Sequence, residues 1–582
     1  MAVTRDDKEV RKIVSRVSKD LWAAFDAKDY LAIAKEIYPI AEDGIASQVS
    51  SSNRNEQHLR CTNAAQELLK QGATGFSVNL TSPAREWFEL GHALTIEDVY
   101  AKHDLDKGLE TLTGAIREVF EVCGIYRELD KAYEHLLAFG TACMLVLPSD
   151  GQGFRFLKAT TLRFGTYALG IGADGMVNRC SRKFELTPAQ IAERFGINAV
   201  PSDWRDRIAR GEGHKDKVVI VNLIEPNGDP KHDKVTDLCG LDKGGWRSLY
   251  WAEWSTRNTS RSDESEILAV HHLKTRPIIA PRLEREAGDI WGRGRGIDAL
   301  PAARALSALR KDLINISGNL AEPALFVDAS LQGQSLKLER GGITYYNGRD
   351  GVPPSQLAIP FASGYQVLLE QQADLRQELA DTFFVSRFAT INALKANPGV
   401  KTATEVEQLV RENMGLLGPV VTNLEQEFLN PLVVTVVDIT LDVAQQEGFN
   451  LGEISPVLGG GLKIRYVGEV HAAMKASNLN ALNGLIGFTG NLIQASQNPE
   501  AFDAVDADAI VREYADASGV KPTCMRDPEA VEQIRAQRNQ AQQQAQQAQV
   551  ELQQAQALKA GAGAVKDASA TPLGAGLMEG LM

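Results

Sequence analysis

An amphipathic segment with an internal proline, residues 402–431, constrains the fold most strongly. Thr402 and Glu405 have the spacing of a capping box, which predicts that a helix begins there. Apolar residues then recur every three or four positions, the period of a helix that buries one face. Pro419 lacks a backbone N–H and its ring clashes with the carbonyl four residues earlier, so this helix is expected to kink at Gly418-Pro419. Taken alone, the segment fits an ordinary buried helix equally well.

Composition and charge narrow the classes of function. The chain has 582 residues, of which 44% are hydrophobic, enough for several domains or for one elongated subunit with a buried core. The formal net charge of -13 argues against a protein that holds nucleic acid by bulk attraction, but it does not exclude one past which DNA slides. The six cysteines have no paired spacing, which is typical of reduced thiols in a cytosolic protein. With no signal-type segment and no apolar run of membrane length, no membrane partner is expected.

Helical patterns dominate the chain, and strand patterns are concentrated in one region. Residues 10–25 and 59–75 have helical periodicity, and further helical pattern follows to about residue 139. Beyond it, short runs of β-branched and aromatic residues alternate with turn signals. The expected strands are 142–147, 154–157, 164–169, 176–186, 218–224, 248–254 and 267–273. These patterns predict a region with an antiparallel sheet inside a mainly helical chain.

Two segments carry apolar residues in narrow seams with heptad-like spacing, which suit helix-on-helix packing. The first seam follows Trp291-Gly-Arg-Gly-Arg-Gly296, whose glycines predict a flexible joint. It comprises Ala302, Leu306, Leu309, Leu313, Ile316 and Leu320, and the second comprises Ile534, Ala541, Ala545, Ala548, Leu552 and Ala555 in the Gln- and Ala-rich end. Both seams predict lateral packing between copies of the chain, because a lone helix of the second kind buries too little to be stable. A disordered polar tail is the alternative for the second seam.

No segment has the pattern of an active site. Gly170, Gly172 and Gly175 match the G-x-G-x-x-G pattern of dinucleotide sites, but they lie between two strand patterns and not before a helix. A hairpin turn is therefore the preferred interpretation, and a dinucleotide-binding enzyme is the alternative. His271 and His272 are neighbours on an expected strand and would point to opposite faces, so they are not expected to share a metal. The sequence predicts no enzymatic activity, no cofactor and no metal site.

Several motifs, taken in order along the chain, resemble one known family. They are residues 63–65, 82–88, 182–187, 195–196, 291–296 and 402–405, Gly418-Pro419 with Glu427 and Pro431, and the Gln-rich end. Together they resemble the portal, or head-to-tail connector, proteins of short-tailed bacteriophages of the podovirus type. Glu86 departs from the family pattern, which often has proline at that position, and residues 466–472 match only loosely. These departures bear on local geometry and not on the family.

The resemblance implies an elongated, mainly helical subunit with an α+β wing, which forms a twelve-fold ring at one vertex of a capsid. In the family's vocabulary, its parts are an amino-terminal helical arm (1–60), wing (61–290), first stem helix (291–320), clip (321–361), second stem helix (362–390), tunnel loop (391–402), long kinked helix (403–446), crown (447–526), barrel helix (527–560) and disordered tail (561–582). The ring would be a passive conduit through which a separate motor packages the genome and from which the genome is later ejected.

The resemblance also implies partners and DNA-facing residues. The expected partners are further copies of the chain, double-stranded DNA, the large terminase motor subunit, tail adaptor proteins, and the major capsid and scaffolding proteins, in the virion and, during assembly, in the host cytoplasm. The residues expected to face DNA are Lys395, Asn397 and Lys401 in the tunnel loop and, with weaker support, Arg304, Arg310 and Lys311 on the first stem helix. For these three stem residues, solvated or inter-subunit ion-pair charges are the favoured alternative. Another structural virion protein, such as a scaffold or tail adaptor, is the alternative for the chain as a whole.

Overall fold

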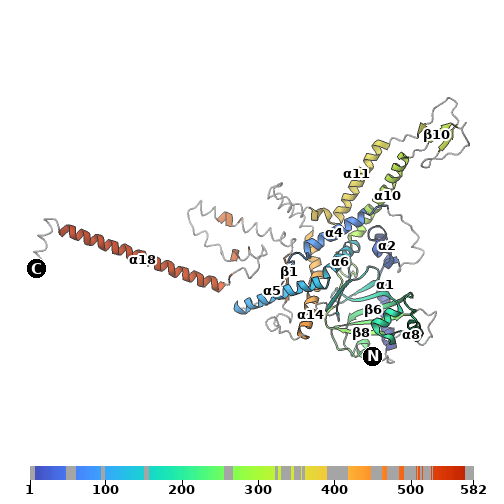
Figure 1. The fold of residues 1–582 in the computed structure, drawn as a ribbon, viewed down its shortest axis with the longest axis horizontal. Helices are drawn as coiled ribbons and strands as arrows, with labels where there is room; N and C mark the ends of the chain where they lie inside the picture. The colour runs from blue at the N-terminus through green and yellow to red at the C-terminus, as the bar shows by residue number, and fades with distance from the viewer. Residues whose placement is uncertain are drawn as a thin grey trace. The chain divides into compact units, whose positions relative to one another are not determined.

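The computed structural model describes residues 7–46, 61–92, 99–149, 156–254, 267–321, 325–328, 343–346, 355–356, 361–389, 417–446, 462–467, 484, 486–489, 506, 509–511, 514, 526 and 528–569. These residues belong to two compact units, Met1–Ser477 and Asn478–Met582. The described part is mostly helical, and its strands lie in the first unit (Figure 1). Most strand pairs are antiparallel, so the expected mixture of helices with antiparallel sheet is confirmed at this level.

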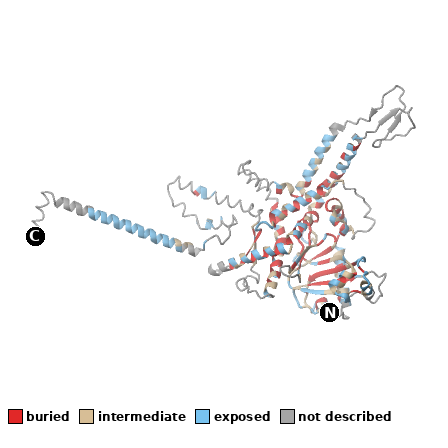
Figure 2. Cartoon of the chain, viewed as in Figure 1, coloured by how far each residue is buried: buried red, intermediate tan, exposed pale blue. Residues whose placement is uncertain are grey.

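Helix α6, Ile125–Phe139, runs through the largest core of the first unit (Figure 2). Gly124 and Gly140 flank it in left-handed conformations, with φ of 69° and 80°, which residues with a Cβ rarely adopt. The helices that precede it are α1 (Asp7–Ala23), α2 (Ala27–Glu36), α3 (Glu42–Ala46), α4 (Ala64–Leu80) and α5 (Val99–Val122). Of these, α2, α4 and α5 pack against α6.

The largest sheet has five antiparallel strands in the order β4-β5-β6-β7-β8. They are β4 (Tyr167–Ile171), β5 (Val177–Leu186), β6 (Val218–Pro226), β7 (Trp246–Glu253) and β8 (Ile267–Leu273), which confirms the last five expected strands. Along β6, Val221 and Leu223 face α1, whereas Val218 and Ile220 face the side covered by α7 (Pro188–Phe195) and α8 (Ser202–Ala209). This alternation arises because successive side chains of a strand point to opposite faces. The sheet is thus covered on both faces, and α1, in the segment expected to be an amino-terminal helical arm, packs on one of them.

Three smaller sheets connect distant parts of the first unit. The first has the order β3-β2-β9 and consists of β3 (Leu157–Thr161), β2 (Met144–Pro148) and β9 (Ile278–Ile279). The second pairs β1 (Phe88–His92) with β13 (Leu462–Tyr466). The third has the order β11-β10-β12 and consists of β11 (Ile343–Tyr346), β10 (Leu325–Asp328) and β12 (Ser355–Gln356). The last of these lies between α10 (Arg295–Ala321) and α11 (Phe361–Thr382) in the sequence, and it contains one parallel pair, β10 with β11. Helices α10 and α11 lie side by side and lead to this sheet (Figure 1).

The second half of the amphipathic segment is a helix with a π-helical turn. Residues 417–424 are α-helical, Glu425–Leu429 form the π turn, and α14 continues from Asn430 to Gln446. The N–H of Asn430 donates to the carbonyl of Glu425, five residues earlier. Pro431 follows and has no N–H to offer in the ordinary α pattern, which accounts for a change of hydrogen bonding here. The kink at Pro419 stays a prediction, since the structure describes this segment only from residue 417.

The second unit is described mainly by α18, Pro528–Ser569. The helix extends nine residues beyond residue 560, through part of the segment that was expected to be a disordered tail. Alanines around Gly561 and Gly563 have the highest helix propensity of all residues, and they offset the two glycines there. Asp506 Oδ1 accepts a hydrogen bond from the N–H of Ala509, which is the geometry of a helix cap. None of the described helices is both long enough and apolar enough to span a membrane.

Candidate functional site

The segment 280–297, which we call the joint, connects β9 to α10 and packs against the end of α6. Gly292 and Gly294 lie directly on the backbone of Gly140, so closely that a Cβ at either position would overlap its atoms. The N–H of Gly292 also donates to the hydroxyl of Thr141 at 2.7 Å. The expectation that these glycines make a flexible joint is therefore corrected, because the structure uses them for close backbone approach.

Arg282 holds the joint from inside the protein, where it is 1% exposed. Its Nε and Nη2 donate to the two carboxylate oxygens of Glu427, each at 3.0 Å, and its backbone N–H also donates to Glu427. The guanidinium further donates to the carbonyl oxygens of Asp289, at 2.9 Å, and Gly175, at 3.0 Å. Bidentate ion pairs between an arginine and a carboxylate are stronger than neutral hydrogen bonds. One side chain thus connects the joint, the β4–β5 turn and the helix that carries Glu427.

Glu427 lies in the π turn and is only 5% exposed. Its Oε1 is also 3.1 Å from Nε of Arg285, and Asn423, one helical turn earlier, donates to the carbonyl oxygens of Arg282 and Leu283. A buried ion pair repays its desolvation only when its hydrogen-bonding capacity is used in this way. Glu427 was one of the residues that carry the family resemblance, but no interaction was predicted for it. A buried arginine in a loop leaves no periodic signal in a sequence.

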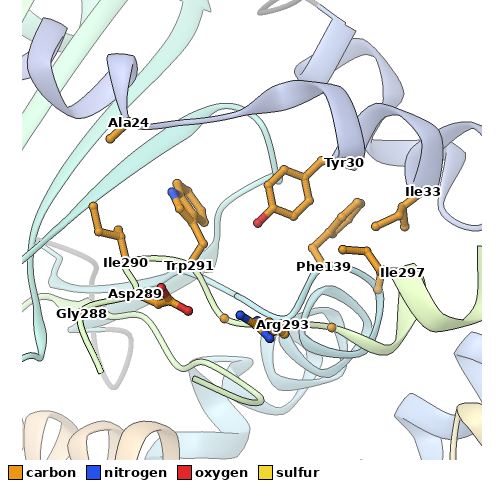
Figure 3. Close-up of a pocket in the computed structure, with 13 residues that line it drawn as sticks. Ala24, Tyr30, Ile33, Phe139, Gly288, Asp289, Ile290, Trp291, Arg293 and Ile297 are labelled. Carbon is orange, nitrogen blue, oxygen red and sulfur yellow. The ribbon is translucent and has the colours of Figure 1, made fainter. Parts of the chain in front are cut away.

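A pocket of about 410 Å³ lies beside this ion pair, between α2, the end of α6 and the joint (Figure 3). Tyr30, Phe139 and Trp291 form its aromatic walls, with the ring centroid of Tyr30 at 6.2 Å from that of Phe139 and 6.3 Å from that of Trp291. Asp289 supplies a carboxylate to the lining, and the half-exposed Ile297 an apolar surface. The volume falls in the range of small-molecule sites.

The three residues expected to face DNA in the tunnel loop, Lys395, Asn397 and Lys401, lie outside the described residues. Arg304, Arg310 and Lys311 lie on α10 and are exposed. Within the part of the chain that the structure describes, none of the three forms an ion pair. Their charges are therefore not neutralised within one subunit by any described residue.

The exposed cations of α10 do not all point the same way. Residues two positions apart on a helix differ by about 200° in direction. Arg304 and Lys311 are each two positions from a buried leucine of the seam, Leu306 or Leu313, so they lie opposite the buried side. Arg310 lies closer to that buried side. Arg304 and Lys311 thus form one stripe, two helical turns apart.

The first apolar seam, which was expected to pack between copies, is partly covered within the single chain. Leu306 is 2% exposed and Leu313 is 5% exposed within a single chain, where α10 packs against α11 and against the core. Leu309 and Ile316 are half-buried, and the side chain of Leu320 lies outside the described residues. Because Leu306 and Leu313 are already covered, a contact between copies would use other apolar residues of α10, such as Ile314, which is 53% exposed.

Most of the second apolar seam is exposed among the described residues, although its first member, Ile534, is half-buried. Its alanines and leucine are all exposed along α18, as the pale colour of this helix in Figure 2 shows: Ala541, Ala545, Ala548, Leu552 and Ala555. Leu552 is 62% exposed. The described residues of the second unit therefore leave this seam available, in contrast to the first one.

The glycine motif forms a hairpin and not a dinucleotide site. It spans the end of β4 and the turn into β5, where the N–H of Gly172 donates to the carbonyl of Met176 and Gly175 has a φ of 73°. His271 packs against Tyr250 at 5.8 Å between ring centroids, whereas His272 contacts Asn227, so the two histidines have separate surroundings. Among the described residues, no group of three or more acidic, histidine or cysteine side chains could hold a metal ion.

Comparison of the sequence with known proteins assigns the chain to a family. A family model described as "Bacteriophage head to tail connecting protein" matches residues 19–525. The portal protein of Salmonella phage epsilon15 is 28% identical over 516 residues, which cover 88% of this chain and 87% of the relative. The probable portal protein of Bordetella phage BPP-1 is 28% identical over 502 residues, with 85% of each chain covered. A chain from the virion of a native gene transfer agent particle matches with 13% identity and a TM-score of 0.31, covering 75% of this chain and 92% of that one.

Proposed function

Because the chain belongs to the bacteriophage head to tail connecting protein family, whose members are structural components of the virion, we propose that it forms a closed ring of twelve copies at one capsid vertex. The match to the family model over residues 19–525 carries this proposal. The two portal relatives support it, since they align with this chain over most of their length. The ring would serve as a passive conduit for genome packaging and ejection and would attach the motor and the tail.

Exposed apolar residues on α10, α11 and α18 support contacts between copies. On the first two helices, Ile314 is 53%, Tyr365 43% and Val367 51% exposed in the single chain. On α18, Val550 is 51% exposed. Large apolar side chains on an exposed helix would suit a surface that a neighbouring chain covers, if they form a contiguous patch in the ring. A ring repeats one head-to-tail contact around an axis, so one such surface per subunit serves every neighbour.

The negative charge of the chain suits a conduit that must not grip DNA. Each phosphate that a protein neutralises adds affinity, and DNA carries about one charge per 1.7 Å of its axis. An acidic ring, built from chains of net charge -13, would keep the duplex mobile, and salt screening over about 8 Å would confine the repulsion to the channel wall. A few positively charged side chains at fixed positions along the channel axis would keep the duplex centred. The duplex, a separate large terminase motor, tail adaptors and capsid and scaffolding proteins are the proposed partners, with assembly in the host cytoplasm.

Lys395 is the residue we propose to meet DNA most directly, once per subunit, in a loop with Asn397 that projects into the channel. Arg304 and Lys311 are the secondary candidates, because they form an exposed stripe with no ion pair to any described residue. Arg310, which lies nearer the buried side of α10, is the weaker member of this group. Lys401 stands beside the expected start of the long helix, where a cation opposes the helix dipole, and it should matter less for DNA.

The conduit is tested by packaging with Lys395→Ala, and Lys401→Ala is the matched control. Both variants should assemble as the wild type does. Lys395→Ala should change the packaged genome length or infectivity, by an amount that depends on ionic strength as phosphate contacts do. Lys401→Ala should change neither by as much. Wild-type genome length and infectivity for Lys395→Ala, at two ionic strengths, would contradict the assignment of this lysine to the channel.

A further inference from the structure

The pocket beside the joint is lined by Asp289, whose backbone is held by a hydrogen bond but whose carboxylate has no partner among the described residues. The backbone carbonyl of Asp289 accepts a hydrogen bond from Arg282 at 2.9 Å, which fixes the position of this residue. Its side chain, in contrast, accepts no hydrogen bond and forms no ion pair within the part of the chain that the structure describes. The same residue lines the pocket (Figure 3). A ligand that enters the pocket therefore meets a carboxylate whose acceptor positions are not used by any described residue.

The surroundings of the pocket are acidic. Burial and the carboxylates of Asp29, Asp26 and Asp289 together raise the pKa of Tyr30 to about 12, so its hydroxyl stays protonated at neutral pH. Arg293 supplies a guanidinium to the lining, but its side chain is 63% exposed and its Nη1 lies 3.2 Å from the carboxylate of Glu286. The lining cation Arg293 is thus paired with Glu286, which leaves the carboxylate of Asp289 available to a positive ligand.

The walls of the pocket are aromatic and are held by further rings behind them. Phe25 stacks on Tyr30 with centroids 5.7 Å apart and contacts Trp291 at 5.0 Å, and Phe164 packs against Tyr30 at 4.9 Å. Aromatic faces attract guanidinium and ammonium groups within about 6 Å through the ring quadrupole. Because these neighbouring rings hold Tyr30 and Trp291 in place, little conformational freedom would be lost when a ligand binds.

We propose that this pocket is a binding site for an organic cation, a guanidinium or alkylammonium group that lies against the rings of Tyr30 and Trp291 and pairs with the carboxylate of Asp289. Such a group has two possible sources, a free small molecule or a basic side chain of another copy of this chain. The site itself is complete within one subunit, so the inference does not rest on ring assembly. Neutral molecules of the same shape should bind poorly, because they leave the carboxylate unpaired in an aromatic pocket.

The test measures binding of n-butylguanidinium to the full-length chain by isothermal titration calorimetry. The matched probe is n-butylurea, which has nearly the same shape and no charge. The guanidinium should bind at least tenfold more tightly than the urea, and Asp289→Asn should weaken its binding about tenfold or more. The control Asp237→Asn removes an exposed carboxylate on α9 (Lys234–Leu238), outside the pocket lining, and should leave binding unchanged. Equal binding of both probes, undiminished binding by Asp289→Asn, or no binding at all would overturn the proposal.

A second arm of the experiment distinguishes the two sources. The titration is run on two fractions of the purified chain that are separated by size, the unassembled subunit and the assembled oligomer. If n-butylguanidinium binds the free chain and the oligomer alike, the site serves a free cation. If it binds only the free chain, a basic side chain of a neighbouring copy occupies the pocket after assembly, and Asp289→Asn should then weaken the oligomer. Both of these results support the site, whereas binding to neither form overturns it.

Discussion

The joint and helix α18 differ in how far their interacting side chains are buried. In the joint, Arg282 is buried and all of its contacts come from the same chain, chiefly from Glu427. Along α18, Leu552 and its neighbouring alanines are exposed, and the described residues of that unit do not cover them. The joint is therefore held by contacts within one subunit, whereas α18 has an apolar surface that the described residues of its unit leave exposed.

The buried ion pair of the joint stabilises the folded subunit, whereas the apolar seam of α18 is expected to stabilise the contact between subunits. A buried ion pair is costly to disturb because the partner that remains is still charged and out of water. An exposed apolar seam contributes little to the stability of one chain, but it gains hydrophobic stabilisation when a copy covers it. Substitutions in the two regions should accordingly affect different measurements, unfolding in the first and association in the second.

Glu427→Ala should have the largest effect on the subunit. It removes both carboxylate oxygens that accept from the buried guanidinium of Arg282, together with one ion pair of Arg285, so the free energy of unfolding should fall by about 3–5 kcal/mol. The measurement is the denaturant midpoint and slope of the purified variant. Glu286→Ala is the control: among the described residues its carboxylate pairs only with the exposed Arg293, so the substitution should cost less than about 1 kcal/mol.

A double variant checks the physical reason for this loss. Replacing both partners, Arg282→Met with Glu427→Leu, leaves no unpaired charge, and it should therefore destabilise the chain less than Glu427→Ala alone. If the double variant were the less stable of the two, the loss would come from packing at the π turn and not from the stranded charge.

Leu306→Ala and Leu552→Ala compare the two seams directly. Leu306 is 2% exposed, so its truncation should lower the free energy of unfolding by about 2–5 kcal/mol. Leu552 is 62% exposed, so its truncation should stay within about 0.5 kcal/mol and weaken association instead. Unfolding and sedimentation of both variants give the comparison. Equal losses in unfolding free energy would show that α18 is already packed within the subunit.

Gly294→Ala should have a smaller effect, since it tests close packing without removing a charge. The added Cβ meets the backbone of Gly140, so the joint must shift, at a cost of about 1–3 kcal/mol. Gly114→Ala in α5 is the matched control, because no other atom lies within 4 Å of the new Cβ and alanine favours the helix by about 0.5–1 kcal/mol. Thermal unfolding of the two variants should shift in opposite directions. A stabilised Gly294→Ala would restore the flexible-joint interpretation.

Periodic patterns predicted the elements of this fold well, because burial on one face leaves a repeat in the sequence. The strands of the five-stranded sheet and the helix that became α10 are examples. The same patterns could not say what covers a buried face. Leu306 and Leu552 belong to seams of the same spacing, yet the first is covered by its own chain and the second is not. Which neighbour covers a helix depends on contacts between segments far apart in the sequence.

The joint was the least predictable part of the site. Its glycines have the same sequence appearance whether they provide flexibility or close approach, and only the position of Gly140 decides between the two. Arg282 and Glu427 are 145 residues apart, and neither stands in a pattern that marks it as buried. The pocket beside them is built from α2, α6 and the joint, so no local motif could reveal it.

We expect the joint to be stable within one subunit and the exposed helices to become buried only when copies of the chain meet. Native mass spectrometry of the purified full-length chain at micromolar concentration, with negative-stain images of the same sample, tests it most directly. We predict closed rings of several hundred kilodaltons with a single symmetry. A monodisperse, folded monomer would contradict the claim.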